Sequence, residues 1–532
     1  MRVGLVCLAA AAAIIVGFWA WLGAPVSMPN APLSPGEKLW CMSYAPFRGS
    51  QTPYDPDIKI PAAQIDEDLR QLAKITDCVR TYSDDQGIEQ APAIAAKYGL
   101  KVLQGIWLSG KRDKDAIQIR AGVELANRYP ETIRALVVGN EVLLRGEMSG
   151  ADLASTLRAV KAQVKVPVTY ADVWEFWLRN PEVASAVDFI TIHILPYWED
   201  FPVPAAQAAA HVEAIRRKLV AAFPGKEVVI GEVGWPSAGR MREGALPSRA
   251  NQARVIQDVL ALAKREHFKV NVIESFDAPW KRAAEGTVGG HWGLLDGTTR
   301  APKFAWGAAV SNHPDWLWQA AAGVLLAVLT FAAAFTAGRR QDIPASLWLA
   351  ITANALAGGL LIGWAVENVG LESLGVGLWV RSLTLVAAAT LTPIVASAAV
   401  MTQKPMPPLA AVLSVATLRK SDRLTAALGL MLVVAIVLSL QVALGLVFDP
   451  RYKDFPFAPL TAAIVPLFVH SLSVARAPGL RGAAETVGAV LLALSIIYIV
   501  PNETLANWQS LWLCAAFAAL ALTLFRVRGA RD

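Results

Sequence analysis

Hydrophobic and polar positions follow two different patterns along the chain. Between residues 38 and 310, short runs of Val, Ile and Leu alternate with stretches whose apolar residues recur at the spacing of one helix face. From residue 315 to 532 the apolar residues form runs of about 20, long enough to cross the ~30 Å core of a bilayer. We therefore expect an α/β domain at 38–310 and a membrane domain at 315–532.

The alternating region predicts eight strands separated by helices. The expected strands are Leu39–Ala45, Asp77–Tyr82, Lys101–Trp107, Ala135–Asn140, Pro167–Ala171, Phe189–His193, Val228–Gly231 and Val270–Ser275. Eight strands alternating with helices over about 250 residues predict a (β/α)8 TIM barrel. A doubly wound open sheet is the alternative, although no glycine-rich phosphate loop follows the first strand.

The N-terminal region predicts a membrane anchor at residues 1–24 and a linker at 25–37. The apolar run from Val3 to Leu22 is longer than the 7–15 residue core of a cleaved signal peptide. We expect an uncleaved anchor that starts in the cytoplasm, with cleavage near Ala24 as the alternative.

About seven transmembrane helices are expected in the membrane domain, at approximately 317–337, 345–366, 382–402, 424–447, 458–475, 484–500 and 506–525. Basic residues gather in the loops that follow the first, third, fifth and seventh of them: Arg339, Arg340, Lys404, Arg419, Lys420, Arg423, Arg476, Arg481, Arg526, Arg528 and Arg531. Because Lys and Arg are enriched in cytoplasmic loops, we expect those loops inside and the α/β domain outside the cytoplasmic membrane.

Charge and cysteine content narrow the function classes. The net charge is +6, and much of the excess lies in short loops beside the predicted spans, so we interpret it as topology and not as nucleic-acid binding. No cysteine spacing of the zinc type occurs, and the sequence predicts no metal site and no cofactor. Cys41 and Cys78 lie near two predicted strands and either pair in an oxidising compartment or remain buried thiols.

Two predicted strands are each followed by a glycine and a glutamate. Glu141 follows the fourth strand and Glu232 follows the seventh, and chemistry in such barrels lies at the carboxyl ends of the strands. Two carboxylates that flank a sugar bond can break it, one as acid and base and the other as nucleophile. We expect Glu141 as acid/base and Glu232 as nucleophile, the alternative for each being a salt-bridged scaffold residue.

Further polar and aromatic residues fall at or just beyond strand ends, where they are candidates for sugar binding. Flat indole faces suit the apolar faces of glucose rings, and tyrosine and asparagine can hydrogen-bond hydroxyls. The alternative for each is buried packing. The candidates are Tyr44, Tyr82, Asn140, Tyr170, Tyr197, Trp235, Trp280 and Trp292.

The segments Val138–Glu141 and Gly231–Ser237 resemble the two signatures of glycoside hydrolase family 17. The resemblance covers about residues 38–306 and includes Arg80-Thr81-Tyr82, Pro196-Tyr197 and Trp292–Asp296. It implies a retaining (β/α)8 enzyme acting on β-1,3-glucan, with the same two catalytic glutamates. The chain departs from the plant members at Ala278, where an accessory Glu is expected, whereas Lys281 is retained and is a further candidate for substrate binding.

The overall design resembles bacterial membrane-bound members of that family. It implies a multi-pass protein of the bacterial cytoplasmic (inner) membrane with its catalytic domain on the periplasmic side. The implied partners are β-glucan and membrane lipid, with a glucan synthase as a further candidate.

Three functions remain open at this point. The first is a transglycosylase that elongates or branches envelope β-glucan, and the second is a β-1,3-glucan hydrolase. Both share the first half-reaction, so the residues do not separate them. The third, of another class, is a membrane glucan conduit with a sugar-binding barrel, which charged residues inside the membrane would favour.

Overall fold

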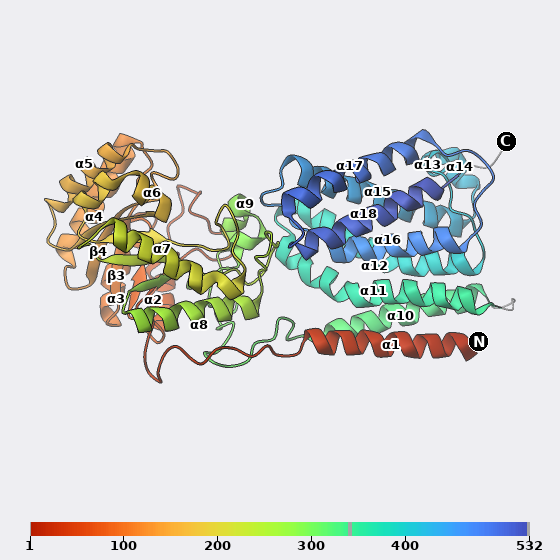
Figure 1. Cartoon of the computed structure of the whole chain (residues 1–532), viewed down its shortest axis with the longest axis horizontal. Coiled ribbons are helices and arrows are strands. Elements are labelled where there is room, and N and C mark those ends of the chain that lie inside the picture. The colour runs from red at the N-terminus through yellow and green to blue at the C-terminus, as the bar shows by residue number, and fades with distance from the viewer. Residues whose placement is uncertain (1, 339–342, 529–532) are drawn as a thin grey trace. The chain divides into compact units, whose positions relative to one another are not determined.

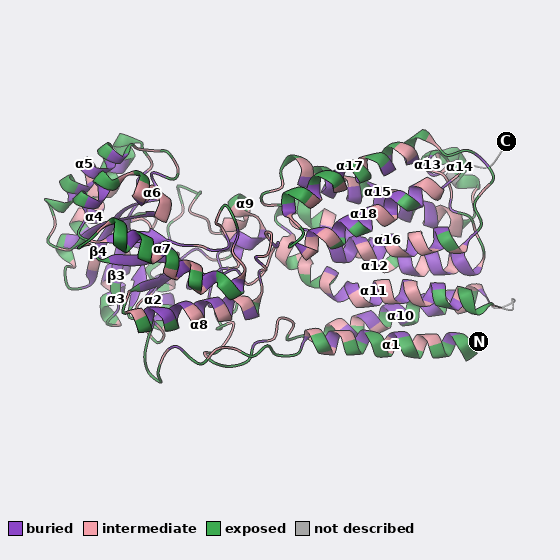
Figure 2. Cartoon of the chain, viewed as in Figure 1, coloured by how far each residue is buried: buried purple, intermediate pink, exposed green. Residues whose placement is uncertain are grey.

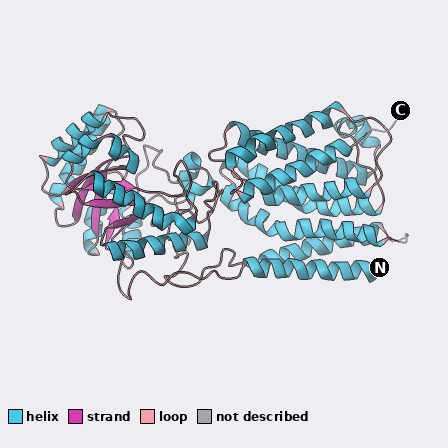
Figure 3. Cartoon of the chain, viewed as in Figure 1, coloured by secondary structure: helices cyan, strands magenta, loops and turns pink. Residues whose placement is uncertain are grey.

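The computed structural model describes residues 2–338 and 343–528, and two compact units divide the chain. One unit comprises Met1–Pro25, Gly239–Glu243 and Ser311–Asp532, and the other Val26–Ala238 and Gly244–Val310. Figures 1 and 3 show that the strands all belong to the second of these units, whereas the first is helical. Each unit is described below by itself.

The second unit is built on a closed barrel of eight parallel strands, which confirms the predicted TIM-like fold. Each strand pairs with the next in sequence, and β8 closes the ring by pairing with β1. The observed strands are shorter at several ends than the sequence predicts. They are β1 (Cys41–Ser43), β2 (Cys78–Arg80), β3 (Lys101–Ile106), β4 (Ile133–Asn140), β5 (Val168–Val173), β6 (Ile190–His193), β7 (Val228–Val233) and β8 (Val270–Val272).

Helices surround the barrel because alternate strand residues are apolar and point outward. Met42, Val79, Leu136 and Ile230 belong to one large buried cluster that also contains apolar helix residues such as Leu157. Complete burial of such a side chain contributes roughly 1.5–3 kcal/mol, and Figure 2 shows the strands buried beneath the helices. The helices are α2 (Ala62–Leu72), α3 (Ala91–Lys97), α4 (Arg112–Arg128), α5 (Gly150–Lys161), α6 (Trp174–Arg179), α7 (Ala208–Ala222), α8 (Arg249–Glu266) and α9 (Arg282–Glu285).

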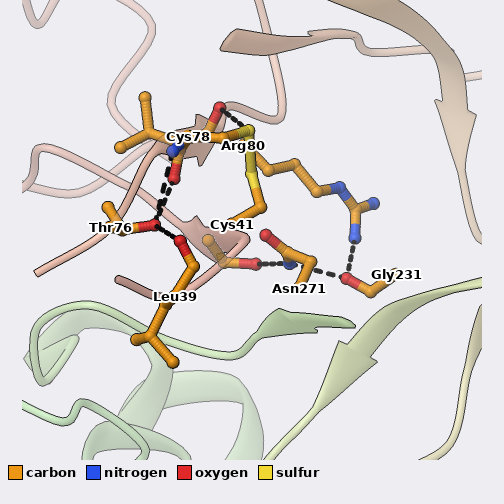
Figure 4. The surroundings of a disulfide bond; sticks show 9 residues. Leu39, Cys41, Thr76, Cys78, Arg80, Gly231 and Asn271 are labelled. Carbon is orange, nitrogen blue, oxygen red and sulfur yellow. Dashed lines mark hydrogen bonds between the residues drawn. A yellow bond between two sulfur atoms is a disulfide. The ribbon is translucent and has the colours of Figure 1, made fainter. Parts of the chain in front are cut away.

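The opposite face of the strands carries a disulfide between Cys41 on β1 and Cys78 on β2. Both half-cystines are fully buried, and they form a small separate cluster with Leu103, Ala135 and Val137. The sequence left a disulfide and two free thiols open, and the structure contains the disulfide. Figure 4 shows it beside Arg80, whose side chain extends from β2 toward the carbonyl oxygen of Gly231.

The other unit contains eight apolar helices. Seven of them have the length and composition of membrane spans: α1 (Arg2–Leu22), α10 (Trp316–Ala337), α11 (Ala345–Glu372), α12 (Gly375–Met401), α15 (Arg423–Phe448), α17 (Ala483–Glu503) and α18 (Trp508–Arg526). An eighth, α16 (Phe457–Ser473), is shorter, at 17 residues. Large apolar side chains such as Val437 and Ile497 are 60% and 69% exposed on these helices, as expected where lipid surrounds them. The chain is therefore a candidate multi-pass membrane protein.

Small residues allow these helices to approach closely. A Cβ atom added to Gly323 on α10 would lie 2.1 Å from the carbonyl oxygen of Gly359 on α11, a contact of the kind that small residues permit between membrane helices. Figure 1 shows the start of α1 and the end of α18 on the same side of this unit. Among the described basic residues, those that follow α12, α16 and α18, such as Lys404, Arg476 and Arg528, therefore gather at that end of the unit.

This unit also includes residues 239–243, which follow β7 in sequence. Arg240 is 5% exposed and forms an ion pair with Glu503 on α17. Its guanidinium also donates hydrogen bonds to the carbonyl oxygens of Pro450 and Lys453. Because an unpaired buried charge is costly, this arrangement holds the segment firmly within the helical unit.

Candidate active site

The backbone at the end of β4 turns sharply to present Glu141. Gly139 and Glu141 both have positive φ angles, 85° and 54°. This left-handed conformation is cheap for glycine but costs a glutamate about 1–3 kcal/mol. The amide of Glu141 donates to the carbonyl oxygen of Ala171 on β5, which fixes the turn. Strain that neighbouring structure maintains in this way is a frequent property of active sites.

Glu232 lies on β7 and is almost completely buried, with an exposed fraction of 5%. The side chain of Arg80 reaches it from β2, with Nη1 3.2 Å from Glu232 Oε1. The hydroxyl of Tyr82 lies 2.8 Å from the same oxygen. A guanidinium and a phenol that both donate to one carboxylate oxygen fix the direction of that group. Glu232 is thus held with its carboxylate pointing into the barrel mouth.

His193, at the end of β6, lies between the two glutamates. Its Nδ1 is 2.8 Å from Glu141 Oε1, and its Nε2 is 3.5 Å from Glu232 Oε1. One oxygen of each glutamate and one His193 nitrogen all lie within 4.8 Å of one another. Retaining glycosidases place their carboxyl groups about 5–5.5 Å apart, whereas inverting enzymes need about 6.5–9.5 Å. The observed separation fits the retaining geometry.

Burial and His193 act in opposite directions on Glu141. Burial raises the pKa of Glu141, but the hydrogen bond and charge of His193, together with Arg145 and Arg80, outweigh it and leave the pKa below its usual range. The Glu141 side chain is 24% exposed, whereas that of His193 is fully buried. His193 is therefore a main cause of the lowered pKa of Glu141.

Glu141, His193 and Glu232 are residue types that often bind metal ions. The positively charged guanidinium of Arg80, however, already lies against two of them. The guanidinium of Arg80 is 3.2 Å from both His193 Nε2 and Glu232 Oε1, and its Nη2 donates to Asn140 Oδ1 at 2.5 Å. A metal ion bound to the same atoms would be repelled by this permanent charge. These residues do not fit a cation, and we assign no metal role to them.

A second group of charges follows β8. The side chain of Lys281 donates to Glu274 Oε2 at 2.9 Å, and both residues are largely buried. Burial raises the pKa of Glu274, although the charge of Lys281 opposes this shift. Burial also raises the pKa of Glu285 to about 7. Lys281 opposes this second shift, whereas the negative charges of Glu274, Glu141 and Glu232 add to it. Glu285 is therefore a carboxyl group that exchanges protons near neutral pH.

This group supplies the accessory carboxylate that the sequence appeared to lack at Ala278. Glu274, four positions earlier, pairs with Lys281 instead. The sequence analysis missed Glu274 and Glu285. Glu274 had a usable signal, because it follows Val272 and Ile273 as Glu232 follows the apolar run of β7. Glu285 had none, since it lies on a short helix with no strand before it.

The structure brings some predicted sugar-binding residues to the glutamates. Tyr82 contacts Glu232, and Asn140 accepts from Arg80. Lys281 is bound to Glu274. Trp280 is half-buried and meets the exposed Tyr54 edge to face at 5.8 Å. Phe47 also contacts Trp280, so these rings form an aromatic surface.

Other predicted residues lie beneath the surface. Tyr44 is buried and donates to Asp68, in a cluster with Arg48 and Arg300. Tyr170 is buried and bonds Asp172, whose pKa burial raises to about 6. The remaining three form an aromatic cluster with Trp198 and are 0–2% exposed: Tyr197, Trp235 and Trp292. The indole of Trp235 donates to the carbonyl oxygen of Leu246, so its polar edge is already occupied.

Comparisons with known proteins identify relatives of part of this chain. Residues 41–293 match the family model described as the BtgE/BtgC glycoside hydrolase domain. A glucan 1,3-beta-glucosidase of Schizosaccharomyces pombe is 28% identical over 40% of this chain and 72% of its own length. A glucan 1,3-beta-glucosidase of Arthroderma benhamiae is 27% identical over 48% of this chain and 87% of its own length.

A solved structure is similar to the barrel region as well. The glycoside hydrolase family 17 beta-1,3-glucanosyltransferase from Rhizomucor miehei is 27% identical, with 50% of this chain and 95% of that chain covered and a TM-score of 0.44. By its sequence, this chain thus carries a domain similar to the BtgE/BtgC glycoside hydrolases, followed by a set of long apolar helices.

Proposed function

We propose that this protein is a retaining β-1,3-glucan transglycosylase of the cell envelope. One observation carries the proposal: a carboxylate oxygen of Glu141 and one of Glu232 lie within 4.8 Å of each other at the carboxyl ends of β4 and β7. That separation suits a nucleophile on one side of a sugar ring and an acid on the other. The names of the matching relatives support β-1,3-glucan as the substrate.

In the first step, Glu232 attacks the anomeric carbon of the donor glucan. The bond to the leaving oxygen breaks as Glu141 gives that oxygen a proton, and the sugar remains as an ester on Glu232. Arg80 and Tyr82 hold the carboxylate of Glu232 in position before attack. The 2.8 Å bond between His193 and Glu141 gives the imidazole a direct path to return a proton to this acid.

In the second step, Glu141 acts as a base. It takes the proton from a hydroxyl of a second glucan chain, whose oxygen attacks the anomeric carbon and releases Glu232. Asn140 lies beside the pair and can bond a sugar hydroxyl next to the reacting carbon. The product has the retained configuration and is longer than the donor.

A hydrolase would use water in this second step, and it is the alternative within the same chemistry. The two are separated by incubating the detergent-purified full chain with reduced and unreduced laminari-oligosaccharides. Products longer than the donor support transfer, and products that are only shorter support hydrolysis. Glu141→Gln and Glu232→Gln are each expected to lower either activity by about 10³-fold or more, with Glu147→Gln as a partly exposed control.

If both glutamine variants kept full activity on glucan, the catalytic proposal would be wrong. A conduit with a binding barrel would then be favoured if the same variants still exported glucan across proteoliposomes. We place this third function below the other two because two carboxylates lie within 4.8 Å of each other and beside the charge of Arg80, an arrangement that suits the proposed nucleophile and acid.

The proposed location is a bacterial cytoplasmic membrane with the barrel on its periplasmic side. The described basic loops gather at one end of the helical unit, which the enrichment of Lys and Arg in cytoplasmic loops assigns to the cytoplasm. The barrel is connected in sequence to the end of α1 and the start of α10, and both of these lie at the opposite end of the unit. The disulfide between Cys41 and Cys78 supports an oxidising compartment for the barrel. Labelling of an introduced surface cysteine at Lys114 by a membrane-impermeant maleimide in intact spheroplasts tests this side.

A further inference from the structure

Three arginines line a hollow at the end of the helical unit where the basic loops gather. Arg476 follows α16, and Arg526 and Arg528 lie at the end of α18. His470 and Ser471, from the last turn of α16, form the rest of its polar wall. The hollow is shallow and open to solvent, with a cavity volume of about 20 Å³. Both elements that build it lie within one unit of the chain.

No described carboxylate is paired with the arginines that line this hollow. Within the described residues 2–338 and 343–528, neither Arg476 nor Arg528 is paired with a carboxylate, and the buried Nε of Arg528 has no hydrogen-bond partner. Arg526 uses its Nε to donate to the carbonyl oxygen of Ser471 at 2.9 Å, which fixes its guanidinium at the wall. Like charges gathered in one place repel, so an anion between them lowers the free energy of the bundle.

The buried histidine gives an independent indication. His470 is 1% exposed, and its Nε2 donates to the carbonyl oxygen of Lys404 at 2.9 Å. Its Nδ1 is buried without a partner. With Nε2 already used as a donor, Nδ1 of the ring is left as an acceptor that can take a hydrogen bond from a hydroxyl of a bound group, such as a protonated phosphate oxygen. The hollow thus joins two unbalanced guanidinium groups to a buried ring nitrogen that lacks a bond.

We propose that this hollow binds the phosphate of an anionic lipid head group. Guanidinium groups match phosphate oxygens in geometry as well as charge. The hollow lies at the end of α18, which is long enough to span a bilayer, beside the shorter apolar helix α16. Basic pockets between membrane helices are known head-group sites. Other basic residues at this end, such as Arg419 and Lys420 on α14 (Val415–Lys420), do not line this hollow.

The test uses the full chain in a neutral maltoside detergent at 150 mM salt. Its thermal midpoint is followed while dioctanoyl phosphatidic acid, dioctanoyl phosphatidylcholine or inorganic phosphate is added, because a ligand that binds the folded state raises the midpoint by mass action. We expect a saturable rise with phosphatidic acid. The double variant R476Q/R528Q should need about 30-fold more of it, since each basic residue near a lipid surface contributes about fivefold.

The control is R419Q/K420Q, which removes the same charge outside the hollow and should leave the response within about threefold of wild type. An absent rise, an equal rise with phosphatidylcholine, or an equal loss in both double variants would overturn the site. Saturation by inorganic phosphate at the same concentration would assign it to free phosphate and overturn the lipid. If R476Q/R528Q does not fold, R476Q alone alters an exposed side chain and should shift the response about fivefold.

Discussion

The guanidinium of Arg80 and the carboxylate of Glu232 meet at 3.2 Å inside a closed barrel, where their side chains are 1% and 6% exposed. This ion pair joins β2 to β7 across the mouth of the barrel. It places a permanent positive charge next to the proposed nucleophile and fixes the direction in which that nucleophile points.

Replacing Arg80 by Met should therefore damage both stability and reaction rate. The variant leaves Glu232 buried without its cation, which typically costs about 3–5 kcal/mol. We expect a lower thermal midpoint and a loss of kcat on laminari-oligosaccharides. The exposed Arg179 serves as the control, since Arg179→Gln removes the same charge from the surface. An R80M variant as active as wild type would remove Arg80 from the proposed mechanism.

Replacing His193 by Gln should move the pH profile of the enzyme. In the native site, His193 outweighs burial and lowers the pKa of Glu141. Without it, burial dominates and the pKa of Glu141 rises, so the limb of the kcat/KM profile that reports Glu141 should shift to higher pH. Glutamine keeps a hydrogen-bond donor but cannot hold the proton. A lower rate with an unshifted profile would mean that His193 acts only as a spacer.

Asp84 should make the barrel less stable as the pH rises. Its carboxyl is 4% exposed and has no hydrogen-bond partner, and burial raises its pKa from 3.8 to about 8. The folded state therefore holds a proton that the unfolded chain releases, so stability falls between pH 4 and pH 8. Asp84→Asn should raise the free energy of unfolding at pH 8 by roughly 1–3 kcal/mol, and with it the thermal midpoint. At pH 4 it should change either quantity little. Equal effects at both pH values would contradict this account.

Removing the disulfide should destabilise the barrel without changing its charges. Cys41 and Cys78 are 37 residues apart, and closing a loop of that size stabilises a fold by about 2–4 kcal/mol. The Cys41→Ala/Cys78→Ala double variant should unfold at lower temperature and lose its sensitivity to dithiothreitol. The double variant of Cys7 and Cys514, which are free, provides the control. A wild-type barrel that is indifferent to reductant would argue against a stabilising role.

The sequence predicted the barrel and the pair of glutamates because both depend on local pattern. Apolar strands alternating with helices predict the fold. A glutamate directly after a buried strand lies at the carboxyl end of that strand, where active sites of such barrels are found. The disulfide could not be decided in this way. It depends on the register of β1 and β2, in which Met42 faces Val79 and the neighbouring cysteines therefore meet.

The electrostatic surroundings were also out of reach. His193 links the two glutamates only because β6 and β7 are adjacent and shifted by a bulge, which pairs His193 with Glu232. Tryptophans show the same limit. A Trp after a strand end predicts an exposed ring, yet Trp235 turns inward and bonds the carbonyl oxygen of Leu246. Such orientations are fixed by packing between distant segments and not by the local sequence.

The left-handed backbone of Glu141 has one more consequence, for how the protein tolerates change. Glycine and asparagine adopt this conformation at lower cost than glutamate does. Replacing Glu141 by glycine or by asparagine should yield a protein without the proposed activity that accumulates to higher levels than the wild type. A selection for abundance alone would thus favour loss of the proposed acid, and only a selection for activity would keep it: stability and activity are traded against each other at a single residue.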